Sequence, residues 1–314
     1  MTGAARQGGR DAAAAAAPAG AGPRAAPPAA LVCVNLAAVV EQAAAGPGPY
    51  RVGADGAPYV PAGDGGIVLG VRLGDGVFAH AADHAAPGAC LTHGDPAAAC
   101  ALAAQACIGN EVTVRSGAAA GARGMVAGKR GEGGRVIAAF AQPVLARLRP
   151  GDRVAVRSRG QGAAELAPGV VLRNIDPWLL ARLPVAVAGR RVSVGVRAVV
   201  PGKLVGNGIG RPTPMWDLDL QLTPATAAGY GAAGLRLGDL VAMTDIDARF
   251  NAGYRRGWAS VGIVVHGGSP QPGHGPGVTV ILSGPADAIV PRVEETEHDG
   301  LREGVVLDVA GTDP

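Results

Sequence analysis

A turn phrase that occurs three times constrains the fold of this chain most strongly. The phrase reads Leu or Val, Arg, any residue, Gly, Asp, any residue and Val. It occurs at Val71–Val77, Leu148–Val154 and Leu235–Val241. Glycine supplies unusual backbone angles, aspartate can hydrogen-bond within its own turn, and alternating apolar residues after it match a half-buried strand. The copies are too widely and unequally spaced for a solenoid repeat. The phrase therefore predicts turns that launch the strands of small β-barrels.

Strand-like apolar runs fill much of the remaining sequence, whereas helices are few. Strands are expected at 66–73, 111–115, 135–140, 153–157, 191–200, 217–222, 240–244, 259–266 and 277–282. Helices are expected where an N-cap residue precedes proline, after Asp95, Asp176 and Thr223. The first should run to Cys107, with Gly109 at its C-terminal cap. These patterns predict a mainly β fold (β-rich α+β), with small β-barrel-like domains and a few short helices.

A length of 314 residues suggests two domains between two tails. Residues 1–28, rich in Ala, Gly and Pro, are expected to be disordered. Residues 29–185 would form an N-terminal β-rich domain with an SH3-like segment at 109–140. Residues 186–291 would form a C-terminal β domain that carries the candidate site. Residues 292–314 would form an acidic tail outside the core, in which 304–309 could add an edge strand.

Charge and cysteine usage exclude some classes of protein. A net charge of +3 over the whole length makes nucleic acid an unexpected main partner. The four cysteines lack Cys-x-x-Cys spacing, which favours a reducing cytosol. Arg6 and Arg10 interrupt any signal-peptide core, and no run of about 18 apolar residues could span a membrane. We therefore expect a cytoplasmic protein without membrane association.

A set of separate motifs is similar to one known family. The motifs are Asp55–Pro58, Asp83–Gly88, Cys107–Glu111, Gly128–Lys129, Gly160–Gly162, Asp217–Gln221, Leu235–Asp239 and Gly273–Thr279. In order and spacing they resemble the prokaryotic family called domain of unknown function 4438, over residues 30–285. The resemblance implies a cytosolic, β-rich, two-part protein and supplies no known reaction.

Two segments depart from the pattern of that family. Arg130-Gly-Glu-Gly stands where the pattern has His-Gly-Gly, and Ala85 and Ala86 replace a Val-Glu pair after His84. If relatives use a histidine at position 130 or a glutamate at position 86, this chain has lost or changed that chemistry.

Titratable side chains concentrate in the last third of the chain. Asp245 and Asp247 lie two apart at the end of an expected strand, which would place both carboxylates on one face. Such a pair can share a metal or divide acid and base roles. The alternative is that the two aspartates cap a loop and pair with Arg249 or Arg255.

Histidines supply the other candidate ligands. His266 ends an apolar strand, and His274 lies in a glycine loop with Gly275 and Gly277, whose N–H groups could hold an anion. The expected metal set is Asp83, His84, Asp245, Asp247, His266 and His274. Imidazole and carboxylate suit a divalent Zn, Mn or Fe ion. The alternative for each histidine is a structural role.

Other candidates are a thiol and a group of cations. Cys107 could act as a nucleophile, with His84 as base and Asn110 as oxyanion donor, although a helix C-terminus disfavours thiolate. A substrate carboxylate or phosphate could be bound by Lys129, Arg249, Arg255 and Arg256. The alternative is that these basic residues are solvated. No dinucleotide fingerprint follows a strand, so neither nicotinamide nor flavin is expected.

Three functional hypotheses follow. The first is a cytosolic enzyme, a hydrolase or lyase, that cleaves a C–N or C–O bond of a small anionic metabolite by metal-assisted or acid-base catalysis. Asp245, Asp247, His274 and His84 would be its metal or acid-base groups, and the arginine loop would hold the substrate. The second is a ligand-binding or scaffold protein without catalysis. The third is an RNA-binding protein that uses a basic face of the SH3-like segment, formed by Arg115, Arg123, Lys129, Arg130 and Arg135. Exposed sheet edges also suggest a homo-oligomer.

Overall fold

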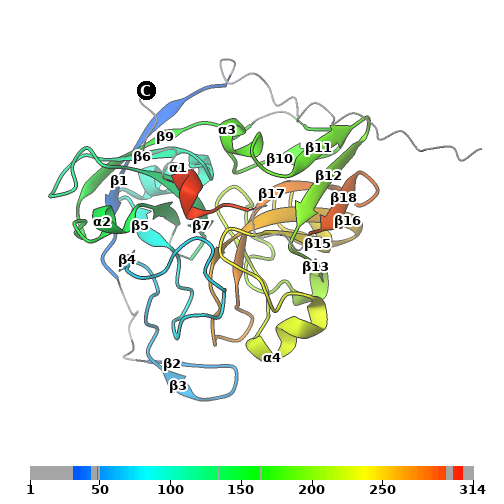
Figure 1. Ribbon diagram of the computed structural model, residues 1–314, viewed down its shortest axis with the longest axis horizontal. Helices are drawn as coiled ribbons and strands as arrows, with labels where there is room; N and C mark the ends of the chain where they lie inside the picture. The colour runs from blue at the N-terminus through cyan, green and yellow to red at the C-terminus, as the bar shows by residue number, and fades with distance from the viewer. Residues whose placement is uncertain are drawn as a thin grey trace, which may run out of the picture.

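The computed structural model describes residues 31–43, 48, 50–132, 134–162, 165–294 and 300–306. The tail at 1–28 lies outside the described residues. Two β structures lie side by side, a barrel on the left of Figure 1 and a larger set of strands on the right. None of the described helices is long and apolar enough to cross a membrane.

The barrel contains six strands in a closed ring. Their order is β1 (Val34–Val40), β9 (Arg153–Ser158), β6 (Glu111–Val114), β7 (Arg123–Arg130), β8 (Arg135–Ala139) and β5 (Gly88–Thr92), and β5 pairs with β1 again. The short β4 (Ile67–Val68) is added beside β5, and β2 (Arg51–Val52) and β3 (Pro58–Tyr59) form a separate hairpin. Residues 109–140 therefore supply only β6, β7 and β8 of the ring.

The second half is built on a long antiparallel hairpin. Its main sheet contains β13 (Ala198–Pro201), β15 (Leu240–Asp247), β16 (Gly253–His266), β17 (Gly277–Pro285) and β10 (Val171–Leu172), with β14 (Leu218–Asp219) also paired to β17. A three-stranded sheet contains β11 (Val185–Ala188), β12 (Arg191–Val196) and β18 (Ile289–Val293). Because β10 precedes residue 185 and pairs with β17, the two halves interlock.

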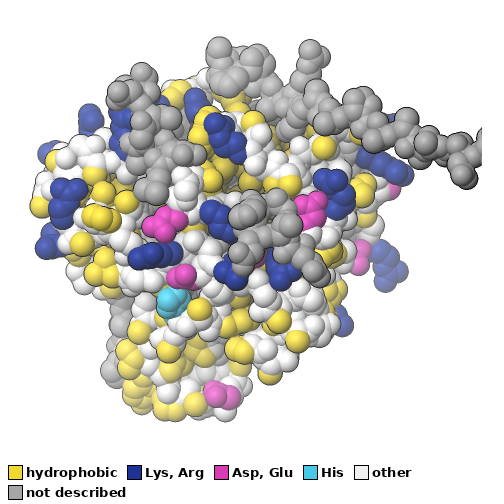
Figure 2. Space-filling model, viewed as in Figure 1, with side chains coloured by type: hydrophobic (Ala, Val, Ile, Leu, Met, Phe, Trp, Pro, Cys, Tyr) yellow, Lys and Arg dark blue, Asp and Glu magenta, His cyan; other side chains and the backbone are white. Residues whose placement is uncertain are grey.

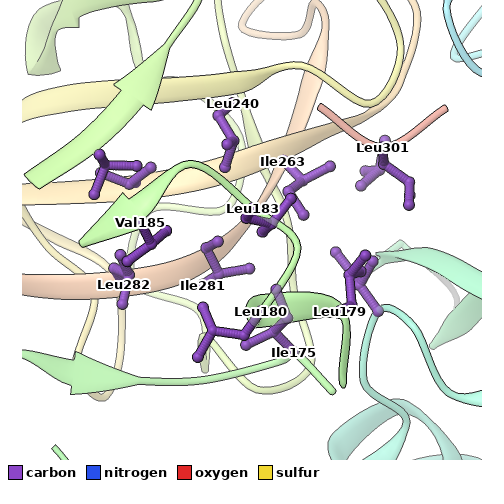
Figure 3. Packing of buried hydrophobic residues seen from close by; sticks show 14 of the residues in the cluster. Ile175, Leu179, Leu180, Leu183, Val185, Leu240, Ile263, Ile281, Leu282 and Leu301 are labelled. Atoms are coloured by element: carbon purple, nitrogen blue, oxygen red, sulfur yellow. The ribbon is translucent and has the colours of Figure 1, made fainter. Parts of the chain in front are cut away.

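A shared hydrophobic core joins the halves. Met125 and Ile137 of the barrel belong to the same buried cluster as Ile263 and Ile281 of the second sheet. Figure 3 shows part of this cluster around α3 (Pro177–Leu180) and the strands beside it. Burial of this much apolar surface is the main force that holds the two sheets together. The site described below lies where the halves meet.

The last described residues enter this core. Leu301 and Val306 are buried in the shared cluster, and residues 303–306 are helical rather than part of an edge strand. The Leu301 N–H donates to the Gly238 carbonyl at 2.7 Å. The acidic segment is therefore followed by residues that pack inside the protein. Residues 295–299 and 307–314 lie outside the described part of the chain.

The three expected helix starts are confirmed. Proline is the first residue of α1 (Pro96–Gln105), α3 and α4 (Pro224–Ala227), and Asp95, Asp176 and Thr223 cap them through their side chains. The other helical segments are α2 (Gln142–Leu145), η2 (Gly202–Leu204) and η3 (Ala228–Tyr230). However, α1 ends at Gln105, and Gly109 occupies a left-handed turn before β6 instead of the helix cap.

The Gly-Asp turns form by the expected mechanism. In each copy the aspartate side chain accepts the backbone N–H three residues before it, at Asp75, Asp152 and Asp239. Two of the turns lead into β9 and β15. The first does not, because residues 74–77 bond to residues 235–237 of the third copy. Of the strand expected at 66–73, only β4 is formed.

Candidate metal centre

Strand register brings the first acidic and imidazole side chains together. Gly277 on β17 pairs with Asp219 on one side and with His266 on the other. A β-carbon at Gly277 would clash with the Nε2 atom of His266. Because Gly277 has no side chain, the His266 ring can lie over the middle strand and reach Asp219 of β14 and Asp217, which precedes that strand. Asp217 and Asp219 lie two apart, so both can face this ring.

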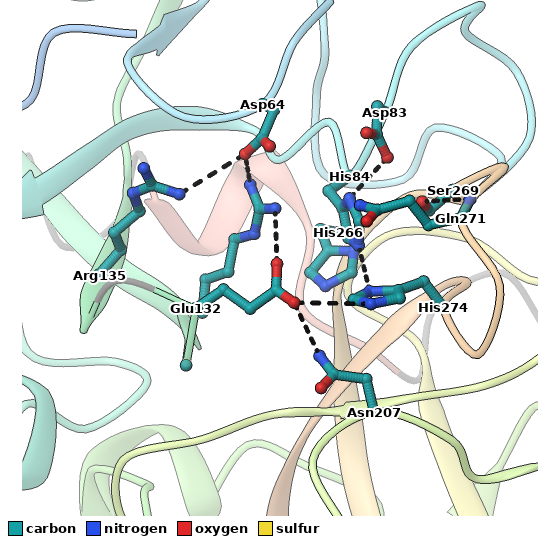
Figure 4. A network of polar contacts seen from close by, with 12 residues as sticks. Asp64, Asp83, His84, Glu132, Arg135, Asn207, His266, Ser269, Gln271 and His274 are labelled. Carbon is teal, nitrogen blue, oxygen red and sulfur yellow. Dashed lines mark hydrogen bonds and ion pairs between the residues drawn. The ribbon is translucent and has the colours of Figure 1, made fainter. Parts of the chain in front are cut away.

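Loops from both halves add two more histidines. His84 precedes β5, and His274 lies in the loop between β16 and β17. Both rings contact Asp219 Oδ2, and Figure 4 shows the His84 and His274 rings joined by a contact. The His84 and His266 ring centres are 4.9 Å apart, and those of His84 and His274 are 5.0 Å apart. His84 has a positive φ of 52°, an unusual angle for a residue with a side chain.

Three ligand atoms lie at separations that suit one metal ion. His84 Nε2 is 3.0 Å from His274 Nδ1, which is 2.8 Å from Asp219 Oδ2. His84 Nε2 is 3.8 Å from the same Asp219 oxygen. Metal–nitrogen bonds of about 2.0 Å in a tetrahedral site place neighbouring ligand atoms about 3.3 Å apart. The three distances bracket that value, so a small shift of each side chain would allow coordination.

Neighbouring groups fix the orientation of the imidazoles. His84 Nδ1 lies 2.6 Å from Asp83 Oδ1, an ion-pair contact without hydrogen-bond geometry, and its Nε2 faces His274 and Asp219. His266 Nδ1 is 2.9 Å from the Gly267 carbonyl, and its Nε2 is 2.8 Å from Asp217 Oδ2. A carboxylate beside the distal nitrogen of a ligand histidine, as Asp83 lies beside His84, is typical of the shell around metal ligands.

Burial and the nearby aspartates decide the protonation of His266. Burial alone would lower the pKa of this imidazole, but Asp217 and Asp219 raise the pKa to about 10. Both ring nitrogens face oxygen acceptors, which fits a doubly protonated ring at neutral pH. Burial would raise the pKa of Asp219, yet contacts with His266 and His274 hold it well below the ordinary value. His266 therefore acts as a buried cation that holds Asp219 ionised.

A second group of acids is already neutralised by arginines. Arg51 Nη1 lies 3.0 Å from Asp64 Oδ2 and 3.1 Å from Asp83 Oδ2. The buried Arg130 pairs with Asp64, and Arg135 lies 3.6 Å from it. Burial would raise the pKa of Asp64, but Arg130 lowers it. The Asp64, Asp83 and His84 group is therefore a poorer metal site than the one at Asp219, because arginine guanidinium groups already lie beside its carboxylates, where a metal ion would bind.

The charges of the buried network leave room for a divalent ion. Four carboxylates, those of Asp64, Asp83, Asp217 and Asp219, are buried there. Arg51, Arg130, Arg135 and the His266 imidazolium supply positive charge, but Arg135 also pairs with Glu41, so five carboxylates face four cations and one negative charge remains. The Asp219 Oδ1 atom is buried and makes no hydrogen bond. Because uncompensated buried charge is costly, a cation beside Asp219 would stabilise this arrangement.

The most exposed part of the site lies at its rim. The His274 side chain is 13% exposed and that of Glu132 is 34% exposed. A cavity of about 350 Å³ lies behind the Gly268–Pro270 segment, whose Ser269 hydroxyl contacts Asp83. His84, Asp219 and His274 do not line that cavity. Access to the three ligand atoms is therefore from the side of His274 and Glu132.

Of the residues expected from the sequence, Asp83, His84, His266 and His274 are brought together, and Asp245 and Asp247 are not. Asp247 pairs with Arg249 and Arg255 at 3.0 Å each, and Asp245 accepts the Gly257 N–H. None of the described clusters of metal-ligand atoms includes either aspartate. Their contacts match the alternative in which they cap a loop and pair with arginines.

The arginines of the β15–β16 hairpin also lie apart from the cluster. Arg249 and Arg255 stack on Trp258, with guanidinium carbons 3.7 Å and 4.3 Å from a ring centre, and Arg256 is exposed. Lysine and arginine side chains are spread among acidic and apolar ones on the face shown in Figure 2. Arg255 and Arg256 lie at the start of β16, whereas His266 is the last residue of that strand, so the arginines and the candidate centre are at opposite ends of it.

Cys107 and Asn110 have structural contacts. Burial raises the pKa of the Cys107 thiol to about 11, so thiolate is strongly disfavoured. The Asn110 amide accepts the Cys107 N–H and donates to Asp176, and no hydrogen-bonding group remains for an oxyanion. Cys107 is thus a buried thiol, and the Asn110 amide is fully used by hydrogen bonds within the protein.

Lys129 and the glycines of the histidine loop also serve packing. The Lys129 ammonium group is fully buried and donates to Asn174 Oδ1 and to the Pro214 carbonyl. A side chain at Gly275 would clash with the Leu220 carbonyl. Gly275 and Gly277 therefore allow close strand contacts, and the structure gives them no open anion site.

The proposed RNA-binding face is not formed by the five basic residues named for it. Lys129 and Arg130 are buried, and Arg135 pairs with Glu41 at 2.7 Å. Arg115 is exposed and Arg123 is half-buried.

The positions that depart from the family pattern also lie inside the protein, since Ala85 and Ala86 belong to buried apolar clusters.

Sequence reasoning missed Asp217, Asp219 and Asp64 as site residues, and it named Arg130 only for an RNA-binding face and as a departure from the family pattern. The signal for the first two was present, because Asp217-Leu-Asp219 has the same spacing as Asp245-Ile-Asp247 and also lies on an expected strand. Strand alternation applies equally to both pairs. Only the pairing of both Asp219 and His266 with Gly277 distinguishes them.

Comparison with known proteins places the chain in a family. The family models of the N-terminal and C-terminal parts of DUF4438, a domain of unknown function, match residues 50–181 and 182–298. A solved structure, described as the crystal structure of TM1086, is similar with a TM-score of 0.84 and 35% identity, over 88% of this chain and 97% of that one. A search of curated proteins finds no match. The two matches span most of the sequence, and the chain therefore belongs to the DUF4438 family.

Proposed function

We propose that this protein is a metal-dependent enzyme, a hydrolase or lyase, that cleaves a C–N or C–O bond of a small anionic metabolite in the cytosol. The observation that carries the proposal is the convergence of His84 Nε2, His274 Nδ1 and Asp219 Oδ2, with separations from 2.8 to 3.8 Å. The described cysteines are all unpaired, which suits a reducing compartment.

The ligand set favours a transition metal over calcium or magnesium. Two imidazoles and one carboxylate suit Zn, Mn or Fe, whereas Ca and Mg prefer oxygen ligands. Three protein ligands leave further coordination positions for water or substrate, which is the arrangement of catalytic rather than structural zinc sites. A bound ion of this kind polarises a carbonyl group and lowers the pKa of water.

The residues around the ligands hold the centre in one geometry. Asp83 orients His84, and the His266 imidazolium holds Asp219 ionised and pointed at the ligand position. In hydrolysis of an amide, the water oxygen would bond to the carbonyl carbon, the C–N bond would break, and the amine would leave with the water proton. The rim at His274 and Glu132 gives the substrate a way in.

Metal analysis of the purified full-length chain tests the proposal. Wild type, His274→Ala and Asp219→Asn would be equilibrated with Zn, Mn or Fe, freed of excess ion and analysed by mass spectrometry. Asp247→Asn is the matched control, because it makes the same change in the other Asp-x-Asp pair. Stoichiometric metal is expected in wild type and in the control, and little in the other two variants.

A wild-type chain that retains no metal would overturn the metal-dependent mechanism. Metal-free acid-base chemistry and the second hypothesis, ligand binding without catalysis, would then remain. If metal is retained, the loaded protein would be screened for hydrolysis of small amides and esters that carry a carboxylate, with and without a chelator.

A further inference from the structure

The Glu132 side chain stands at the mouth of the centre as its most exposed carboxylate. It follows β7 in the turn toward β8, and its oxygens approach three donors. The distances are 3.3 Å to Asn207 Nδ2, 3.5 Å to Arg130 Nη2 and 3.6 Å to His274 Nε2. Dashed lines in Figure 4 mark the contacts with Asn207 and His274. Charge-assisted hydrogen bonds are usually about 2.7 to 2.9 Å long. Glu132 is therefore held loosely by groups that could bind a carboxylate more closely.

Some of the N–H donors around Glu132 have no hydrogen-bond acceptor. Arg130 is only 2% exposed, and its Nε and Nη2 atoms make no hydrogen bond. Buried charged donors without an acceptor are unfavourable, so this guanidinium would gain from a better-placed anion. Asn207 Nδ2 also lies 3.3 Å from Asp219 Oδ2, which links the same donor to the metal ligands.

We propose that Glu132 occupies, in the ligand-free protein, the position of a carboxylate group of the substrate. A small carboxylic acid would displace Glu132 from Arg130, Asn207 and His274, and the rest of the molecule would extend toward Asp219. That the bound acid is a substrate rests on the proposed function. That an anion binds here rests only on the donors Arg130, Asn207 and His274. A carboxylate suits the subsite better than a phosphate, because the nearby carboxylates of Asp217 and Asp219 oppose a second negative charge.

A different role for Glu132 makes a different prediction. A carboxylate that accepts the distal N–H of a metal-bound histidine positions that ligand, and its removal typically weakens metal binding by about 10- to 100-fold. The 3.6 Å distance from His274 Nε2 is longer than a hydrogen bond, which argues against this role. Metal affinity and carboxylate affinity therefore separate the two roles.

The test measures acetate binding to the full-length chain by calorimetric titration, with and without bound metal. Glu132→Ala removes the internal competitor, and Glu165→Ala removes an exposed carboxylate as a matched control. Acetamide serves as a probe of the same shape without charge. Glu132→Ala is expected to bind acetate at least about tenfold more tightly than wild type, because the subsite is no longer occupied. Acetamide should not share the gain, and metal content should be unchanged.

Several outcomes would overturn the inference. Equal acetate affinity in Glu132→Ala and wild type would show that no anion subsite is released, and loss of metal from Glu132→Ala would make Glu132 a positioning residue. In the double variant Glu132→Ala, Asn207→Ala the increase in acetate affinity should be lost. The neutral Glu132→Gln keeps the size of the side chain, so its acetate affinity should increase less than that of Glu132→Ala. If wild type binds no metal but Glu132→Ala gains acetate affinity, the subsite stands and the metal-dependent function fails.

Discussion

His266 and Gly277 pair across neighbouring strands, and the His266 ring fills the space that a side chain at position 277 would need. The same glycine pairs with Asp219 on the opposite strand. A middle strand without a side chain thus allows an imidazole from β16 to meet a carboxylate from β14. This contact places Asp219 between His266 and the two ligand histidines.

Alanine at position 277 should therefore disrupt the centre. Gly277→Ala would push His266 away from Asp219, and we expect loss of stoichiometric metal and a decrease of about 1 to 3 kcal/mol in unfolding free energy. Gly253→Ala in β16 is the control, because a β-carbon there meets no atom within 4 Å. Metal analysis and urea unfolding of both variants check this. Full metal content in Gly277→Ala would contradict the packing argument.

Metal should stabilise the folded chain through the same ligands. An ion that binds only the folded state at about 100 times its dissociation constant adds about 2.7 kcal/mol. We expect zinc or manganese to raise the Tm of wild type by several degrees and a chelator to reverse the rise. His274→Ala should show no rise and Asp245→Ala the full rise. The opposite pattern in differential scanning calorimetry would move the site to the β15–β16 hairpin.

Lys129 should make stability depend on pH. Burial lowers the pKa of its ammonium group from 10.5 to about 8. Between these values the unfolded chain binds more protons than the folded one, so unfolding free energy should rise with pH across this window, by up to about 3 kcal/mol. In Lys129→Met this contribution should be absent. Urea unfolding from pH 7 to 10.5 gives the difference between the two proteins, and parallel curves would refute the prediction.

Removal of Arg130 should destabilise the protein far more than removal of an exposed arginine. Arg130→Met would leave Asp64 with only Arg51 and Arg135, and loss of one partner of a buried ion pair costs about 3 to 5 kcal/mol. Arg255→Met removes an ion pair whose arginine side chain is 53% exposed, so the change should stay within about 1 kcal/mol. Similar effects in chemical denaturation would argue against a structural role for the Arg130–Asp64 pair.

Local sequence signals predicted much of the fold. The Gly-Asp turns, the proline-initiated helices and the mainly β class follow from interactions within a few residues, and the structure has all three. Ring closure of the barrel was not predictable in this way, because β1 pairs with β5 and β9 far along the chain. The first Gly-Asp turn closes on itself through Asp75, but it also bonds to residues 235–237 of the third copy, a long-range pairing that local signals do not predict.

The candidate site was only partly predictable for the same reason. Histidines in glycine loops and after strands drew attention to His84, His266 and His274, but the contact between His84 and His274 spans 190 residues. Two Asp-x-Asp pairs on strands look alike in sequence. Asp217 and Asp219 belong to the cluster because β14 pairs with β17, while Asp245 and Asp247 lie at a bulge of the β15–β16 hairpin.

The position of a bound ion tests the central claim most directly. Crystals of the full-length protein grown with zinc would be measured at the zinc absorption edge, and the anomalous map would locate the ion. The metal-centre assignment predicts a strong peak about 2.0 Å from His84 Nε2, His274 Nδ1 and an Asp219 oxygen. Absence of a peak there, or a peak at Asp245 and Asp247 instead, would contradict it.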